Sequence, residues 1–196
     1  MKKRKKKKEG QYRKSWDYIK ESRNSIFFIL GIFIITALIG GLFEAPPLVS
    51  QAILEKLKEL IELTQGLNTF ELIVFIFFNN LWISFVGLIL GFLAGVVPFF
   101  IAASNGYVLG FVSRAVVQEE GFLELWKLLP HGIFELSAVI ISLGLGVKLG
   151  MFIFTKNPGK EFKKRFFEGI RVFFLVIIPL LFFAAIIEGL LIYFFG

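Results

Sequence analysis

Cysteine is absent from this chain of 196 residues, and histidine and aspartate occur once each, as His131 and Asp17. The absence of cysteine excludes disulfides, thiolate nucleophiles and cysteine-ligated metal sites. The single histidine excludes a zincin site, because that site needs two histidines four residues apart on one helix. Metal and thiol chemistry therefore have few ligands to use, and we expect neither a metal nor a cofactor.

Apolar residues, in contrast, are abundant. Hydrophobic residues make up 56% of the chain and aromatic residues 17%, with phenylalanine alone occurring 26 times. The mean hydropathy is +0.76. Soluble chains are about 45–50% apolar even when glycine is counted, so an ordinary soluble enzyme and a disordered tail are both excluded. The composition predicts an integral membrane protein whose main solvent is the lipid bilayer.

Positive charge is concentrated at the N-terminus. The net charge is +7, yet residues 1–24 alone hold eleven basic and three acidic residues. A nucleic-acid-binding fold would spread positive charge over its surface, so we expect no nucleic acid partner. We interpret residues 1–24 as a basic cytoplasmic tail that fixes the topology, with attachment to anionic lipid as the alternative.

Apolar runs of the length needed to cross a bilayer occur five times. A helix needs about 20 apolar residues to cross roughly 30 Å of hydrocarbon. Residues 72–113 carry no charge and are long enough for two crossings, joined by a turn at Gly95–Pro98 or, alternatively, at Ser104–Gly106. The sequence predicts an all-α, polytopic integral membrane helix bundle in one transmembrane domain, residues 25–196. We place its spans at about 25–43, 72–97, 99–117, 133–154 and 172–195.

The charges between the spans predict the orientation of the chain. Residues 44–71 hold five acids and two lysines, residues 118–131 hold three acids and one lysine, and residues 155–171 hold six basic residues and two acids. Basic loops remain in the cytoplasm. We therefore expect a plasma membrane protein with the N-terminus and 155–171 in the cytoplasm. The segments 44–71 and 118–131 and the C-terminus are expected outside it.

An amphipathic helix is predicted on the outer side, over residues 47–64. Val49, Ile53, Leu57, Leu60, Ile61 and Thr64 recur at helical spacing among charged residues. Pro46 and Pro47 suit a helix start. Lipid headgroups, the protein's own spans, a protein partner or a second copy must cover this stripe.

Glycines recur at four-residue spacing inside three spans. Such glycines let helix backbones approach closely in lipid, where the hydrophobic effect does not drive helices together. The spacing predicts packing within the bundle, or alternatively a homodimer face. The residues are Gly87, Gly91, Gly95, Gly106, Gly110, Gly146 and Gly150.

Polar residues inside the spans are the candidate functional residues. A charge costs at least about 2.5–3.5 kcal/mol at the bilayer centre, so such residues usually face protein and have a partner. The candidates are Asn79, Asn80, Asn105, Arg114, His131, Glu135 and Glu188, and the topology places all but Asn105 in the outer half of the membrane.

Two arrangements of these polar residues are open. In a closed clamp, Arg114 pairs with Glu135 while Glu188 bonds one of the two neighbouring asparagines. In the other, the residues line an outward-facing cavity for an ion, a solute or a peptide. Lys148, near the inner end of its span, is expected to extend to the membrane surface. Pro179 is expected to kink the last span.

Several of these motifs, taken together, resemble those of the stage II sporulation protein M (SpoIIM) family. They are Phe78-Asn79-Asn80, the series Gly87, Gly91 and Gly95 with Pro98, Asn105-Gly106, the run Pro130-His131-Gly132-Ile133-Phe134-Glu135-Leu136, and Glu188-Gly189. The resemblance implies a multi-span protein that anchors and scaffolds peptidoglycan hydrolases during engulfment in spore-forming bacteria. Relatives occur in non-sporulating organisms, including archaea, and a cysteine-free chain rich in glutamate and lysine fits such a thermophilic source.

Three functions follow from these patterns. The first is a membrane scaffold that binds membrane or extracytoplasmic partner proteins or a second copy of itself. The second is a small transporter or permease component with a polar pocket in the outer half of the membrane. The third is an intramembrane enzyme that uses His131 and Glu135 as base and acid. We expect a scaffold, and no enzyme activity.

Overall fold

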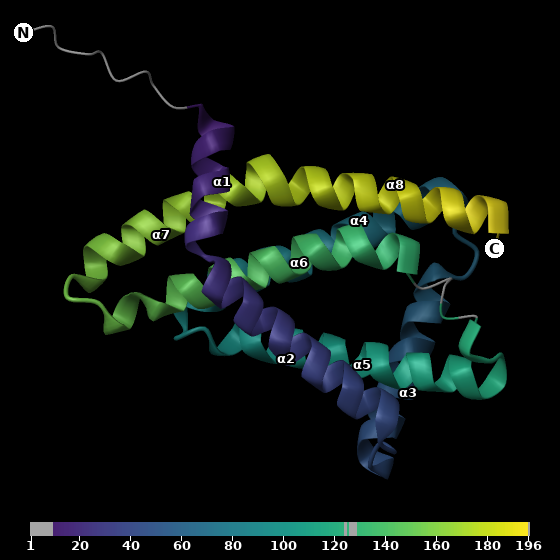
Figure 1. Ribbon diagram of the computed structural model, residues 1–196. Coiled ribbons are helices and arrows are strands. Elements are labelled where there is room, and N and C mark those ends of the chain that lie inside the picture. The colour runs from purple at the N-terminus through teal and green to yellow at the C-terminus, as the bar shows by residue number, and fades with distance from the viewer. Residues whose placement is uncertain (1–9, 124, 126–128, 196) are drawn as a thin grey trace, which may run out of the picture.

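The computed structural model in Figure 1 describes residues 10–123, 125 and 129–195, and for 129–134 and 188–195 only the course of the backbone. The described chain is all-α, as the apolar runs predict. Its long helices are α1 (Gln11–Glu21), α2 (Arg23–Leu42), α3 (Pro47–Thr64), α4 (Thr69–Ile89), α5 (Val96–Glu119), α6 (Leu129–Gly150), α7 (Pro158–Val172) and α8 (Ile178–Phe195). Short 3-10 turns η1 (Leu90–Phe92) and η3 (Met151–Phe154) and a π-helical turn η4 (Phe173–Ile177) extend α4, α6 and α7.

Five helices in the described chain are long and apolar enough to cross a membrane, which is the number that the sequence predicts. They lie at Arg23–Leu42, Thr69–Phe92, Val96–Glu119, Glu135–Phe154 and Pro158–Ile187. The last begins well before the predicted 172–195, because residues 158–172 are also helical and continue into α8. The fold is therefore a membrane-embedded helix bundle.

A tight turn at Leu93–Gly95 joins η1 to α5, at the first of the two expected places. Ala94 has φ 54° and Gly95 has φ 75°, so both residues are left-handed and reverse the chain within one turn. Pro98 then falls in the first turn of α5. Backbone N–H groups in this turn have no carbonyl partner within the helix, so the absence of an N–H on proline costs no hydrogen bond. The alternative turn at Ser104–Gly106 is wrong, since these residues lie inside α5.

The two ends of the bundle differ in charge, and we name them accordingly. The basic end is formed by α1, the Leu93–Gly95 turn and α7, and the acidic end by α3 and residues 120–123. Figure 1 shows α1 and α3 crossing opposite ends of the bundle, roughly perpendicular to the long helices. Pro179 of α8 follows directly after the π-helical turn η4, because its ring cannot fit against the carbonyl of a regular α-helical turn.

The helices α2 and α5 run parallel and pack through glycine. A Cβ atom on Gly106 would overlap the carbonyl oxygen of Phe33, and one on Gly110 would lie 2.7 Å from the backbone nitrogen of Gly41. These are backbone atoms that cannot rotate aside. The contact therefore exists only because the side chains are absent.

A second glycine contact joins α4 to α6, which also run parallel. Gly87 and Gly91 contact the backbone of Gly146. Gly150 contacts the backbone of the Leu93–Gly95 turn. All seven glycines that the sequence singles out thus lie at helix contacts inside one chain.

Helix α6 is the centre of the bundle. Within its spanning segment 61% of the residues are buried, against 17–33% in the other four spans. One side of α6 packs against α2 and α5 around Ile29, Phe33 and Leu143, and the other against α4 and α8 around Leu145 and Leu181. The pair α2–α5 diverges from α4, α6 and α8 toward the acidic end (Figure 1).

The predicted outer helix is present as α3, with Pro47 in its first turn. None of its residues is buried, and no described element packs closely against it. Its own bundle therefore leaves the apolar stripe uncovered. A capping box then starts α4, in which Asn68 and Glu71 bond each other's backbone N–H at 2.8 and 3.0 Å.

Candidate functional site

The seven polar residues predicted to cluster are divided between different helix contacts. The structure describes the side chains of five of them: Asn79, Asn80, Asn105, Arg114 and Glu135. His131 lies in α6 and Glu188 in α8, but their side chains are outside the described residues.

Arg114 pairs with Glu44, and this corrects the expected pairing with Glu135. The Nη2 atom of Arg114 lies 3.2 Å from Oε1 of Glu44, which follows the end of α2. Arg114 comes one turn after Gly110 on α5, so it lies on the face that packs against α2. Glu135 lies on α6 beside α4, on the other side of the diverging bundle. The remaining Arg114 nitrogen, Nη1, is buried and makes no hydrogen bond within the described chain.

Glu135 and Asn80 form a separate polar contact between α6 and α4. Asn80 is 8% exposed, and its side chain bonds both the Glu135 carboxyl group and, at 3.1 Å, the carbonyl oxygen of Ile76. One layer toward the basic end, the Ser142 hydroxyl donates to the carbonyl oxygen of Ser84 at 2.8 Å. The glycine contacts between α4 and α6 come next along the same interface. Polar groups and glycines thus share one interface, in which close backbone approach brings the polar groups within bonding distance.

Asn79 and Asn105 are exposed in the structure. Asn105 donates to the carbonyl oxygen of Ile101 in its own helix at 2.9 Å. Asn79 and Asn105 each lie one turn from an isoleucine, Ile83 or Ile101, that packs on the core between the two halves of the bundle. Both asparagines therefore lie on the sides of α4 and α5 that border the divergence at the acidic end.

Two hollows in the described surface adjoin Arg114. The larger, of about 640 Å³, follows the contact between α2 and α5 and is mainly apolar. The smaller, of about 290 Å³, lies on the other side of Arg114, toward Glu44 and Ser50. We refer to the larger hollow as the α2–α5 groove.

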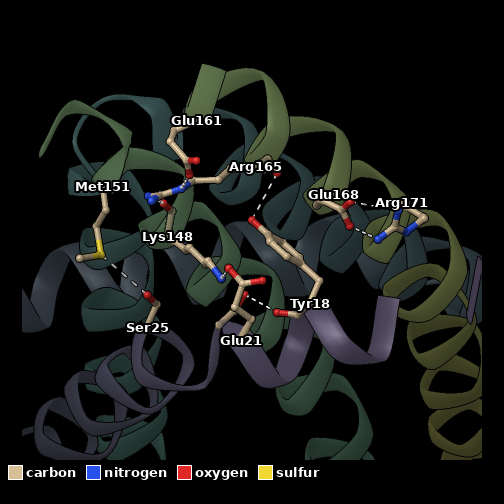
Figure 2. A network of polar contacts seen from close by, with 10 residues as sticks. Tyr18, Glu21, Ser25, Lys148, Met151, Glu161, Arg165, Glu168 and Arg171 are labelled. Atoms are coloured by element: carbon tan, nitrogen blue, oxygen red, sulfur yellow. Dashed lines mark hydrogen bonds and ion pairs between the residues drawn. The ribbon is translucent and has the colours of Figure 1, made fainter. Parts of the chain in front are cut away.

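The basic end holds a denser polar network, shown in Figure 2. Lys148, in the last turn of α6, is 8% exposed, and its Nζ atom lies 2.9 Å from Oε1 of Glu21 in α1. The same ammonium group lies 4.5 Å from the centre of the Tyr18 ring, a cation–π contact. Lys148 does not extend to the surface as the sequence suggested, because α1 covers it.

Helix α7 supplies the rest of this network. Arg165 donates from Nη1 to the carbonyl oxygen of Lys148 at 2.7 Å and from Nε to Glu161 at 3.2 Å. The Tyr18 hydroxyl donates to the Arg165 carbonyl oxygen at 3.4 Å, and Arg171 pairs with Glu168. The network therefore fixes α1 and α7 to the end of α6.

The network shifts the titration of its two α1 members. The hydrogen bond from Lys148 lowers the pKa of the Glu21 carboxyl group, so this group stays ionised at neutral pH. Burial raises the pKa of Tyr18 well above its ordinary value, so the phenol stays neutral and able to donate.

Sequence reasoning missed Glu21, Tyr18, Arg165 and Glu44 as partners. The sequence carries a signal for α1, since Ser15, Tyr18 and Ser22 recur every three to four residues and are all buried. The high lysine content of residues 1–24 obscured it. Glu44 sits in a connection between helices, where no periodicity identifies a partner.

The described residues contain no group of three histidine, cysteine, aspartate or glutamate side chains that could hold a metal ion. Within the part that is described, the chemistry on view is ion pairing, hydrogen bonding and close helix packing.

Comparison with known proteins identifies the family of this chain. Residues 19–191 match the family model for stage II sporulation protein M. An uncharacterized protein of Methanocaldococcus jannaschii is 30% identical over 141 residues, which cover 69% of this chain and 62% of that protein. No solved structure matches the chain. The matched range includes all five spanning helices and the residues Glu44, Asn80, Arg114 and Glu135. The chain therefore belongs to the stage II sporulation protein M family.

Proposed function

We propose that this protein is an integral membrane scaffold that binds a partner protein through α3. The supporting observation is the uncovered apolar stripe of an 18-residue helix at the acidic end. Of the stripe residues, Val49, Leu60 and Ile61 are exposed. An exposed apolar patch of this kind is typical of a protein interaction site. The scaffolding role of the family in spore-forming bacteria favours the same reading.

The charge of α3 favours a protein partner over a lipid surface. Helices that lie in lipid headgroups are rich in lysine and arginine. In α3, three glutamates outnumber two lysines, and both lysines are already in ion pairs, Lys56 with Glu59 and Lys58 with Glu62. An anionic membrane surface would therefore attract this helix weakly.

The orientation of the chain belongs to the same proposal. Lys156, Lys160, Lys163 and Lys164 are all exposed at the basic end. Basic segments next to spans stay in the cytoplasm, which leaves α3 on the opposite side of the membrane. Because the chain has no cysteine, single cysteines report topology cleanly. In intact cells, a membrane-impermeant maleimide should label Gln51→Cys and spare Lys163→Cys. Labelling of Lys163→Cys alone would indicate the opposite orientation and contradict this part of the proposal.

Photo-crosslinking in cells tests the scaffold directly. A photoreactive amino acid at Val49 or Leu60 places the probe on the apolar side of α3, and one at Gln51 or Glu62 serves as the matched control on the polar side. The proposal expects a protein adduct from the apolar positions only, one that mass spectrometry assigns to a different polypeptide. Adducts to lipid alone, or equal adducts from both sides of the helix, would contradict it.

A small permease component is a second candidate, favoured by the exposure of Asn79 and Asn105 on facing sides of the diverging helices. A permease requires water at these positions. A charged, water-soluble thiol reagent should then modify Asn105→Cys but not Phe100→Cys, which is exposed on the same helix. If neither cysteine reacts, the divergence is filled by lipid or protein and the permease is excluded.

A further inference from the structure

The α2–α5 groove follows from the glycine contact that joins these two helices. Its floor lies at Gly41 and Gly110, where the backbones come closest. Large apolar side chains rise on both sides, and Phe122 and Leu125 close one end, after Gly121 turns the chain with φ 98°. The volume, about 640 Å³, lies within the range of roughly 300–1,000 Å³ usual for small-molecule sites.

The polar residues of the groove all lie toward one of its ends. Ser113, Arg114 and Gln118 line it toward the acidic end beside the apolar Phe122 and Leu125, whereas the lining toward the middle of the spans, at Phe33 and Ile34, is apolar only. The nine residue steps of α2 from Phe33 to Leu42 correspond to about 14 Å along the helix axis. This gradient parallels that of a membrane lipid, whose headgroup lies at the surface and whose chains lie deeper.

Arg114 has an unused donor at the polar end of the groove. Its Nη2 atom is bonded to Glu44, but Nη1 is buried and has no hydrogen-bond partner in the described chain. Glu44 is largely exposed, so solvent screens the attraction between its carboxylate and the guanidinium group. A guanidinium group binds phosphate oxygens through two parallel hydrogen bonds. Arg114 therefore places a guanidinium group with an unused donor on the wall of an apolar groove.

We propose that the α2–α5 groove binds one membrane phospholipid. An acyl chain lies over Gly41 and Gly110, and the Arg114 guanidinium group turns from the exposed Glu44 to donate a hydrogen bond to the phosphate. A second copy of the chain would cover the apolar walls but would leave that buried donor unpaired. A phospholipid supplies the apolar chain and the anion together and is already present at this depth of the membrane.

Native mass spectrometry of the purified full chain in detergent tests this proposal. Three probes are titrated: phosphatidylglycerol, diacylglycerol with the same acyl chains, and glycerol 3-phosphate, which has no chains. Phosphatidylglycerol should bind most tightly. Arg114→Gln should weaken its binding by about tenfold, as expected for a lost hydrogen bond to a charged group, without changing diacylglycerol binding. Leu109→Trp should fill the groove and weaken both lipids. Arg23→Gln, an exposed arginine at the other end, is the matched control and should change neither.

Glu44→Gln distinguishes ligand binding from a structural role of the ion pair. It removes the carboxylate that competes for the guanidinium group, so phosphatidylglycerol should bind several-fold more tightly. A purely structural pair would give weaker binding instead. The proposal is overturned if Arg114→Gln matches Arg23→Gln, if diacylglycerol or glycerol 3-phosphate binds as well as the phospholipid, or if Leu109→Trp abolishes a dimer and leaves lipid binding intact.

Discussion

Replacing Gly146 by alanine tests whether the close contact between α4 and α6 holds the bundle together. The added methyl group would overlap the carbonyl oxygen of Gly87 and lie 3.1 Å from its carbonyl carbon and 3.3 Å from Cα of Leu88. All three are backbone atoms of a helix that cannot rotate away. The two helices must therefore separate to admit the methyl group.

The magnitude follows from three opposing contributions. Alanine is favoured over glycine inside a helix by about 1 kcal/mol. Overpacking costs about 1–3 kcal/mol, and separation also breaks the Ser142–Ser84 hydrogen bond of 2.8 Å, worth about 1 kcal/mol. The net loss is about 1–3 kcal/mol. For a chain of this size it lowers Tm by roughly 2–12 °C.

Gly31→Ala is the matched control, because a Cβ atom on Gly31 in α2 would meet nothing within 4 Å. Its Tm should stay the same or rise by up to about 4 °C. Circular dichroism melts of both variants, in one detergent and at one heating rate, give the comparison. If Gly146→Ala melts no lower than Gly31→Ala, the α4–α6 contact does not limit stability and the reasoning fails.

Three further predictions concern polar residues. Asn80→Leu should lower the free energy of unfolding by about 1–3 kcal/mol, because Glu135 loses its hydrogen-bond partner. In the same melts, Asn79→Leu at the exposed neighbouring position should change it by less than about 0.5 kcal/mol. Glu21→Gln should destabilise the bundle by leaving Lys148 buried and unpaired, whereas Lys148→Met, which removes that charge, should be neutral or stabilising; equal losses would contradict this. The pKa of Glu21 is lowered in the folded protein, so its contribution is complete above the ordinary glutamate pKa of 4.5 and is lost as the pH falls through the lower folded value. The protection of α1 amides from hydrogen exchange, relative to the intrinsic rate at each pH, should therefore fall below about pH 4.5, and in Glu21→Gln it should be low at neutral pH already.

The sequence predicted the spanning helices because lipid leaves a backbone no alternative. Each N–H and C=O inside the hydrocarbon must bond within its own segment, so a long uncharged run becomes a helix whatever its neighbours are. The glycine spacings were informative for a similar reason, since they allow a contact that larger residues forbid. Residues 158–172 were harder to interpret, because a charged amphipathic helix and a charged loop have similar compositions.

The polar pairings could not be read from the sequence. Arg114 and Glu135 lie at similar predicted depths, and depth alone made them partners. Which residues meet depends also on the direction each side chain takes around its helix and on the angle between helices. The contact at Gly106 and Gly110 turns Arg114 toward α2 and Glu44, away from α6.

The sequence by itself determined that this protein is a bundle of five membrane-spanning helices with an amphipathic helix after the first. Those features depend on hydropathy and length, which are properties of single segments. Only the tertiary structure decided that α1 covers Lys148, that Arg114 keeps a free donor beside an apolar groove, and that α3 is left uncovered. Those features depend on how helices cross and rotate against one another, and packing between segments distant in the chain sets that geometry.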